Sequence, residues 1–267
     1  MQSLNRAILI VLAVGCFLAT AISPVAGQEV LRYSSSAQVS DVFKSEGFGQ
    51  FTKQTGISVD LFVGSSASAV HRLFSGVCDI ASTAEMLAPR HSDYGYVQTP
   101  FCKVPLIVIT HPQTPVNRVS EDQLRGIFAG EITNWKELGG PDHDIIVVVP
   151  GKETAAFRNF TYLALKRFEV KYDFMTYRST MVVEAVRWMP WSISFIAKGM
   201  GNRDAGVKIL NLDGKSYTDA GYPFWETFAF VTKGEPQGAA KALIDYAMSP
   251  ENKKKMKANG IMPLTAK

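Results

Sequence analysis

The sequence lacks the short motifs that mark common enzyme active sites. It contains no GxSxG nucleophile elbow, no HExxH zinc motif, no P-loop and no glycine fingerprint for dinucleotides. Glu85 and Glu153 could act as an acid/base pair, but nothing in the sequence places their carboxylates together. We therefore expect no catalytic residues and no enzymatic activity.

Cysteine and histidine are scarce, with three and four residues. The histidines show no ligand spacing with the cysteines, which argues against a metal site; they are His71, His91, His111 and His143. Cys78 and Cys102 follow the N-terminal apolar segment. In an oxidising compartment they could form a disulfide, or they could be two separately buried thiols, and the sequence leaves both alternatives open. No cofactor is implied.

A strong charge of one sign is also missing. The chain has 28 Lys and Arg against 24 Asp and Glu, and the basic residues are dispersed apart from three lysines at 253–255. A run of this kind usually forms a solvated helix face, so we expect no nucleic-acid partner. No internal repeat and no low-complexity segment is visible.

Long apolar runs are absent after the N-terminus. Residues 1–6 carry one positive charge, residues 7–22 are uncharged and mainly apolar, and small residues precede Gln28. This order predicts a secretory signal peptide over residues 1–27 and a periplasmic location. A membrane anchor is the alternative, but sixteen residues are short for a span. Attachment of a lipoprotein through Cys16 is a minority alternative. Removing residues 1–27 takes away Arg6, which leaves 27 basic against 24 acidic side chains, a net charge of +3.

Residues 127–160 are the most informative stretch. They contain an uninterrupted β-branched run at 145–149, a turn at Pro150-Gly151 and a helix start near 152–154. A strand that enters a helix through a short glycine-containing loop leaves backbone N–H groups unpaired at the helix start. Those donors and the positive end of the helix dipole form a ready site for an anion.

Short strands that run into small polar residues recur before this stretch. Each is followed by a Ser- or Thr-rich loop and then a helix or turn; the strands are expected at 30–33, 57–63 and 79–81, and the helices at 41–54 and 70–75. This alternation is typical of an α/β sheet with ligand loops at the carboxyl ends of the strands.

Two longer strands, at 103–110 and 224–232, separate groups of shorter units. Between and after them we expect further elements: a helix at 120–128 that opens with a capping box at Ser120, a helix at 181–189, strands at 192–197 and 208–212, and helices at 237–248 and from 249 onward. A chain that leaves a first lobe, builds a second and returns would cross twice, near the two long strands. Such a protein closes around a cleft by hinge motion.

Several segments resemble the periplasmic phosphate-binding proteins, which are the extracytoplasmic substrate-binding components of ABC importers. GIFAGEITNWKELGG at 126–140 is similar to the IFxGxITNW segment of that family. Four more segments fall in the family's order and spacing: LRYSSSAQV at 31–39, VGSSAS at 63–68, CDIASTAEML at 78–87 and YPFWETFAFVTKGEPQGAAKALIDYAMSPENKK at 222–254. The resemblance covers nearly the whole mature chain, and the ITNW segment with the C-terminal block is fairly specific.

The resemblance implies the type II periplasmic-binding fold. This is an α/β protein of two lobes, each a mixed sheet flanked by helices, joined by two hinge strands. On this chain we expect a signal peptide at 1–27, the first part of lobe 1 at 28–110, lobe 2 at 111–205 and a return to lobe 1 at 206–267.

The resemblance also implies where the ligand loops fall. The first loop holds Ser36, Ala37 and Gln38, the second Ser65 and Ser66, and the third Thr83 and Ala84. The fourth, usually Ser-Gly-Thr at a helix start, falls on Lys152, Glu153 and Thr154, where only the threonine is retained. We expect ligand contacts from Ser36, Gln38, Ser65, Thr83, Lys152, Thr154, Arg178 and Ser179. As alternatives, the hydroxyl groups could serve only as helix caps or turn residues.

Two departures from the family bear on the ligand. The family usually has an Arg four residues before the serine of the fourth loop, where this chain has Val148, and many members have an Asp in the third loop, where it has Ala84. Glu85 and Glu153 bring carboxylates near the expected cleft and would repel a dianion unless they are paired with Lys152 or Arg178. These basic residues are the candidates to replace the missing Arg.

The sequence therefore predicts an exported, monomeric binding protein that captures a small oxyanion such as phosphate between two lobes and delivers it to an ABC permease. Two alternatives keep the fold. One is a periplasmic sensor or scavenger that presents its bound form to a partner protein, and the other is a binding-fold protein without a small ligand.

Overall fold

The computed structural model describes residues 29–43, 48–166, 169–199 and 206–265. The expected signal peptide and Cys16 lie outside these residues, so both remain predictions. Within the described part of the chain, no helix combines the length and the apolar character needed to cross a bilayer.

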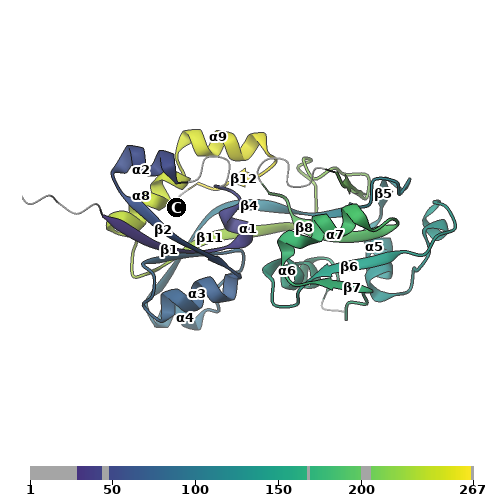
Figure 1. Ribbon diagram of the computed structural model, residues 1–267, viewed down its shortest axis with the longest axis horizontal. Helices are drawn as coiled ribbons and strands as arrows, with labels where there is room; N and C mark the ends of the chain where they lie inside the picture. Colours follow the sequence, from purple (N-terminus) through teal and green to yellow (C-terminus); the bar gives the residue numbers. More distant parts are fainter. Residues whose placement is uncertain (1–28, 44–47, 167–168, 200–205, 266–267) are drawn as a thin grey trace, which may run out of the picture.

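Two long antiparallel strands connect two groups of elements (Figure 1). They are β4 (Tyr96–Thr110) and β11 (Trp225–Lys233). Residues 96–105 of β4 pair with β11, whereas residues 106–110 pair with β8 (Ser192–Ala197). The strands of the main sheet follow the order β2-β1-β3-β11-β4-β8-β6-β7. One strand therefore belongs to both lobes, and the two-lobed α/β architecture predicted from the sequence is confirmed.

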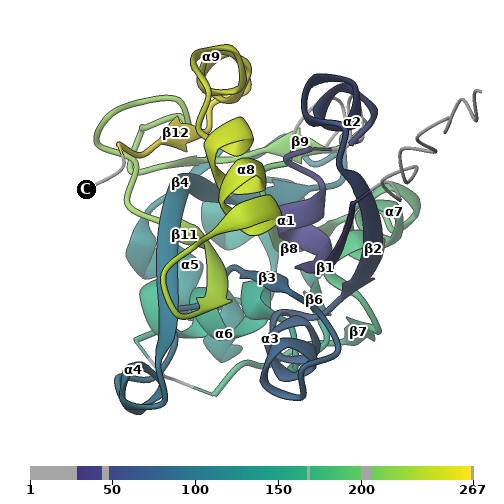
Figure 2. The same cartoon turned by 90° about the vertical axis from the view of Figure 1, so that its left-hand side faces the viewer.

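The first lobe is built on parallel strands. β1 (Val30–Ser36) pairs in parallel with β2 (Ser58–Gly64) and with β3 (Ile80–Thr83), so the three carboxyl ends lie at one edge. Helices cover both faces, with α2, α8 and α9 on one side and α3 and α4 on the other (Figure 2). The remaining elements are α1 (Ala37–Ser40), α2 (Gly49–Thr55), α3 (Ser66–Phe74), α4 (Arg90–Asp93), α8 (Gly238–Ala247), α9 (Pro250–Ala258) and β12 (Met262–Pro263).

The second lobe continues the same sheet and has its own core. β6 (Ile146–Pro150) pairs in parallel with β7 (Phe174–Thr176) and β8. Phe160 stacks on Phe195 with ring centroids 3.7 Å apart, at the centre of the larger hydrophobic cluster. The other elements are β5 (Arg118–Val119), α5 (Glu121–Ala129), η1 (Trp135–Leu138), α6 (Ala155–Leu163), η2 (Ser179–Met181), α7 (Val182–Trp188), β9 (Lys208–Ile209) and β10 (Asn211–Leu212).

Local sequence signals fix several helix starts. Ser120 and Gln123 form the expected capping box at the start of α5, in which each side chain accepts from the other residue's backbone N–H. Pro250 occupies the first turn of α9, after the N-cap Ser249. Both features depend only on residues within one turn, and both agree with the prediction.

Other expected boundaries were wrong. β1 extends to Ser36 because residues 34–36 continue the ladder with β2 as far as Gly64. Helix α3 begins at Ser66, since Ser65 caps it, and not at residue 70. The single helix expected at 41–54 is replaced by the short helices α1 and α2, and the strand expected at 208–212 is split between β9, which pairs with β4, and β10, which pairs with β5.

Several residues that follow the predicted return at residue 206 pack with the second lobe. Leu210, Leu212, Tyr222 and Phe224 are buried in the same cluster as Phe128 and Phe195 of the second lobe. These contacts favour a return along β11, near residue 225, and not at residue 206. The full division of the chain into lobes remains a prediction.

The two cysteines do not form the disulfide that the sequence left open. Cys78 and Cys102 are both free and buried. Cys78 packs with Val70, Leu73 and Val231, whereas Cys102 belongs to the core cluster around Tyr33 and Phe230. Because the two thiols lie in different clusters, the alternative of separately buried thiols is the correct one.

Candidate functional site

The three expected loops of the first lobe lie at one edge of its sheet. The register of β1 and β2 pairs Ser36 with Gly64, the residue before Ser65. Ser36 accepts a hydrogen bond from the Val39 backbone N–H at 3.2 Å, and Ser65 accepts one from Ser68 at 3.1 Å, so both hydroxyl groups cap the helices that follow. The parallel pairing therefore places two capped helix starts side by side.

The third loop is tied to the second. The Ser66 hydroxyl oxygen accepts a hydrogen bond from the Ala84 backbone N–H at 3.1 Å. Thr83 is buried, and its hydroxyl group bonds with the backbone of Glu85. Thr83 thus shapes the turn that carries Ala84 and Glu85, and the structure brings the first three loops together.

The second lobe contributes the start of α6. Thr154 is the N-cap: its hydroxyl group accepts from the Phe157 N–H at 3.2 Å and donates to the Gly151 carbonyl at 2.7 Å. A Cβ at Gly151 would lie 3.1 Å from the carbonyl oxygen of Tyr177, which is closer than nearly all real contacts. Glycine therefore allows the fourth loop to lie against the segment that leads to Arg178.

The segment of Arg178 and Ser179 faces the first lobe. Its short helix η2 lies beside α1, which carries Gln38. Ser36, Gln38 and Ser179 therefore come from opposite lobes to one junction. That these residues bind a ligand remains a prediction.

Arg158, at the end of the first turn of α6, and Asn159, the next residue, connect the lobes directly. The Asn159 side-chain amide donates to the Ala84 carbonyl at 2.8 Å. The Arg158 guanidinium forms an ion pair with Glu85 through two nitrogens, one of them 2.9 Å from Oε2. Ala155, on the same turn, packs in the core of the first lobe. The start of α6 is therefore a contact surface for the third loop.

Glu226 lies beneath these contacts, on β11. Its side chain is 2 % exposed, and its Oε2 accepts from Gln38 Nε2 at 3.4 Å. Among the described residues, Oε1 has no hydrogen-bond partner. Burial is the main cause that raises the pKa of Glu226 to about 8; the nearby Glu85 carboxylate raises it further, and the Asn159 amide lowers it. We use the name interlobe junction for the six residues Gln38, Ala84, Glu85, Arg158, Asn159 and Glu226.

Lys152 and Arg178, the candidate counter-charges for the ligand, lie beside aromatic rings. Lys152 and Arg178 are exposed, with the Lys152 ammonium 5.6 Å from the Tyr172 ring centroid and the Arg178 guanidinium 5.8 Å from that of Tyr177. Arg158 is the residue that pairs with Glu85 and also reaches Glu153 at 3.5 Å. The pairing that relieves Glu85 thus comes from Arg158, and ligand contacts by Lys152 and Arg178 remain predictions.

Sequence reasoning missed three residues of the interlobe junction. Arg158 and Asn159 follow Thr154 by four and five residues, so helical spacing places them near the helix start that was singled out. Glu226 is one carboxylate in the aromatic stretch Trp225–Phe228, and a charged residue inside such a strand is itself a signal, because an unpaired buried charge is costly.

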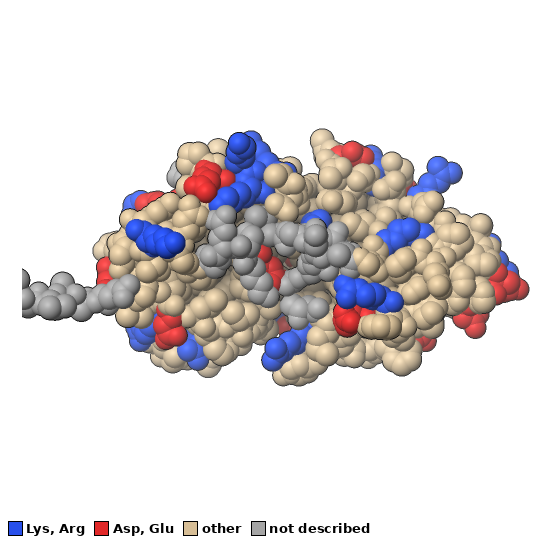
Figure 3. Space-filling model, turned by 45° about the horizontal axis from the view of Figure 1, so that its top comes forward, with Lys and Arg blue, Asp and Glu red and all other residues tan. Residues whose placement is uncertain are grey.

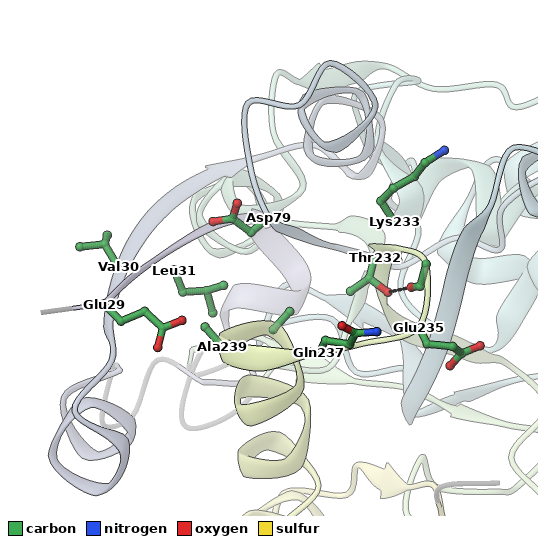
Figure 4. Close-up of a pocket in the computed structure, with 11 residues that line it drawn as sticks. Glu29, Val30, Leu31, Asp79, Thr232, Lys233, Glu235, Gln237 and Ala239 are labelled. Carbon is green, nitrogen blue, oxygen red and sulfur yellow. Dashed lines mark hydrogen bonds between the residues drawn. The ribbon is translucent and has the colours of Figure 1, made fainter.

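Two pockets border the sheet of the first lobe. A pocket of about 500 Å³ is lined by Leu31, Asp79, Thr232 and neighbouring residues, at the opposite end of β1 and β3 from the loops (Figure 4). A pocket of about 330 Å³ adjoins the second and third loops through Ser66, Thr83 and Glu85.

In the described ranges, no group of three or more His, Cys, Asp and Glu could hold a metal ion. On the face in Figure 3, Lys and Arg are scattered among acidic residues.

A family model described as a PBP superfamily domain matches residues 20–251. The chain is 31 % identical to the phosphate-binding protein PstS of Bacillus subtilis over 168 residues, which is 61 % of this chain and 56 % of that protein. It is 25 % identical to PstS of Borreliella burgdorferi over 204 residues, covering 73 % and 67 % of the two chains. The chain thus matches only about half the length of the Bacillus relative.

A solved structure shows the same fold. It is a protein from Clostridium perfringens with bound phosphate, assigned as a substrate-binding protein of a phosphate ABC transporter. The two structures superpose with a TM-score of 0.78 and a sequence identity of 21 %. The match covers 89 % of this chain and 100 % of the Clostridium perfringens chain. At this identity the likeness establishes the arrangement of the elements.

Proposed function

This chain belongs to the PBP superfamily, and from that premise we propose that it is the substrate-binding component of a phosphate ABC importer. In this proposal the chain captures a phosphate-class oxyanion at the interlobe junction and presents it, as a periplasmic monomer, to a membrane permease. Its similarity to phosphate-binding proteins supports the ligand class, and the geometry of the junction supports the choice of binding residues.

The observation that carries the proposal is the meeting of loops from both lobes. The Asn159 side chain on α6 donates a hydrogen bond to the Ala84 carbonyl. The Ser66 hydroxyl oxygen accepts a hydrogen bond from the Ala84 backbone N–H. The helix starts at Ser36, Ser65 and Thr154 bring hydroxyl groups and backbone N–H groups to this region. Helix starts are suited to anions because their first N–H groups lack partners within the helix and the dipole is positive there.

The ion pair of Glu85 with Arg158 reconciles an acidic residue with an anionic ligand. An unpaired Glu85 would repel a dianion. The Arg158 guanidinium balances the negative charge of Glu85, so this residue leaves no net charge at the third loop. Micromolar affinity requires about 8 kcal/mol. Hydrogen bonds to charged groups contribute about 1.5–3 kcal/mol each, so four or five donors at the junction are sufficient if their desolvation is compensated.

Isothermal titration calorimetry on the purified mature protein tests the proposal, with phosphate, arsenate, sulfate and molybdate as ligands. We expect phosphate to bind with micromolar or tighter affinity. Heat near zero for all four oxyanions would overturn the proposal and favour a binding-fold protein without a small ligand. Stimulation of the ATPase activity of a reconstituted phosphate permease by the loaded protein would then separate delivery to an importer from sensing.

A further inference from the structure

We propose that Glu226 contacts the captured anion directly and donates a hydrogen bond to one of its oxygens from a neutral carboxyl group. This inference rests on the proposed function, because it assigns a ligand-selecting role inside the same site. Glu226 was not among the residues that the sequence predicted, and it lies on the strand that connects the lobes.

The position of Glu226 is fixed with respect to both lobes. It lies on β11 opposite Val104 of β4, in the antiparallel pair that spans the junction. Gln38 of α1 approaches it from the first lobe, and Asn159 of α6, from the second lobe, is close enough to lower its pKa. A carboxyl group held at this point meets whatever is enclosed when the lobes close.

One oxygen of Glu226 is available for a ligand. The Oε2 atom accepts the long hydrogen bond from Gln38, whereas Oε1 is buried and has no partner at hydrogen-bond geometry among the residues that the structure describes. The side-chain amide of Asn159 is the neighbouring donor that interacts with this carboxyl group and lowers its pKa. Buried polar atoms in proteins nearly always have a partner, and those without one call for a functional explanation. A ligand oxygen at the junction supplies that partner.

The surroundings of Glu226 favour its neutral form. The groups that face it are the amides of Gln38 and Asn159 and the carboxylate of Glu85, whose charge is already matched by Arg158. Burial away from water and the neighbouring carboxylate both disfavour ionisation. A neutral carboxyl group does not repel an anion, and its O–H is a donor. An ionised carboxylate has the opposite role, because it can only accept a hydrogen bond from an O–H group of the ligand.

This reversal changes which ligands the site accepts. An ionised carboxylate requires a ligand that brings a proton, such as monohydrogen phosphate, and repels the fully deprotonated sulfate dianion. A neutral carboxyl group donates equally to either. With Ala84 in the third loop, where the family often has Asp, the chain lacks the carboxylate that would make this distinction. We therefore expect sulfate to bind as well as phosphate, within about tenfold, a difference of about 1.4 kcal/mol.

Calorimetry with sulfate between about pH 6.5 and pH 9.5 tests the role of Glu226, since sulfate keeps its charge over this range and only the protein titrates. The wild-type affinity should fall above about pH 8, approaching tenfold per pH unit. Glu226→Gln keeps a donor that cannot ionise, so its affinity should stay flat with pH. Glu226→Leu should bind more weakly at every pH, by about tenfold or more. Glu251→Gln, which alters an exposed carboxylate that pairs with Lys255 within α9, away from the interlobe junction, is the matched control and should follow the wild type.

The outcomes separate this inference from the proposed function. Binding of phosphate but not of sulfate, or an identical pH profile for wild type and Glu226→Gln, would overturn the role of Glu226 and leave the proposed function intact. No binding of any oxyanion by the wild type at pH 6.5 would overturn both. If neither Glu226 variant folds, as judged by circular dichroism, an NMR titration of the Glu226 carboxyl carbon in the wild type decides the matter. Ionisation of that carboxyl group below pH 6 in the ligand-bound protein would refute the inference.

Discussion

The guanidinium of Arg158 holds the carboxylate of Glu85 across the boundary between the lobes, with Nη2 2.9 Å from Oε2 and a second nitrogen on the other oxygen. The neighbouring residue Asn159 binds the carbonyl group of Ala84. Two consecutive residues of α6 therefore attach the second lobe to the third loop of the first. This arrangement makes the state of closure depend on a small number of contacts, which can be removed one at a time.

Replacing Arg158 by methionine should favour opening of the lobes. The substitution removes the ion pair and leaves the Glu85 carboxylate, 25 % exposed, without its counter-charge. We expect a larger radius of gyration by small-angle X-ray scattering and a loss of phosphate affinity of about fivefold, as for a partly exposed pair that contributes about 1 kcal/mol. The double variant with Glu85→Gln should recover part of this loss.

Arg125→Met is the matched control for this prediction. Arg125 pairs with Glu121 and Asp122 within α5, so its loss leaves the contacts between the lobes unchanged. An equal change of radius or affinity in both arginine variants would show that the Glu85–Arg158 pair has no particular role in closure.

Thr154→Val should weaken both the fold and ligand binding. The hydroxyl group caps α6, and loss of such a cap costs about 1 kcal/mol of stability. If Thr154 also contacts the anion, calorimetry should show a loss of affinity of more than about twofold, because a net hydrogen bond contributes about 0.5–1.5 kcal/mol.

Ser249→Ala separates the two effects of Thr154. Ser249 caps α9 by accepting from Asn252 at 3.3 Å, away from the interlobe junction. It should lower the free energy of unfolding by a similar amount and leave the affinity unchanged. An unchanged affinity in Thr154→Val as well would remove Thr154 from the binding site.

The buried Glu226 should make stability depend on pH. Its folded-state pKa of about 8 lies above the ordinary value of 4.5, so the folded protein binds a proton that the unfolded chain releases. The stabilisation is complete below pH 4.5 and is lost as pH rises toward 8, by at most about 1.4 kcal/mol per pH unit. Urea unfolding of the ligand-free protein at pH 5, 6, 7 and 8 should show a decline in the wild type that is absent in Glu226→Gln. Parallel curves for the two proteins would show that Glu226 titrates near its ordinary value.

Both cysteines of the mature chain should be free thiols that react slowly. Burial raises the pKa of Cys78 and, more strongly, that of Cys102, which lowers the fraction of reactive thiolate. A thiol reagent should find two thiols per molecule in denaturant without a reductant and much slower reaction in the native protein. Fewer than two thiols in denaturant would indicate that a disulfide forms after export.

Predictions from sequence were accurate where a single turn or strand determines the outcome. The capping box at Ser120, the proline at position 250 and the β-branched run before Pro150 were all read correctly, because each depends on neighbours in the chain. The alternation of short strands with polar loops also predicted an α/β sheet with these loops at the carboxyl ends of its strands. These features were sufficient to place the ligand loops at one edge of the sheet.

The pairing of charges could not be predicted in the same way. Glu85 and Arg158 are 73 residues apart, and Gln38 and Glu226 are 188 residues apart. Such contacts depend on the angle between the lobes, which no local pattern specifies. For the same reason the sequence could not decide between a disulfide and two thiols, since the choice depends on which core each cysteine enters.

The shared strand β4 has a mechanical consequence. Because residues 96–105 pair with β11 and residues 106–110 with β8, the polypeptide between the lobes is hydrogen-bonded along its length. We expect release of a solute to proceed by twisting of this paired ribbon, because no unpaired hinge segment separates the two pairings along β4, all of whose residues the structure describes. Such a ribbon should limit how far the lobes separate.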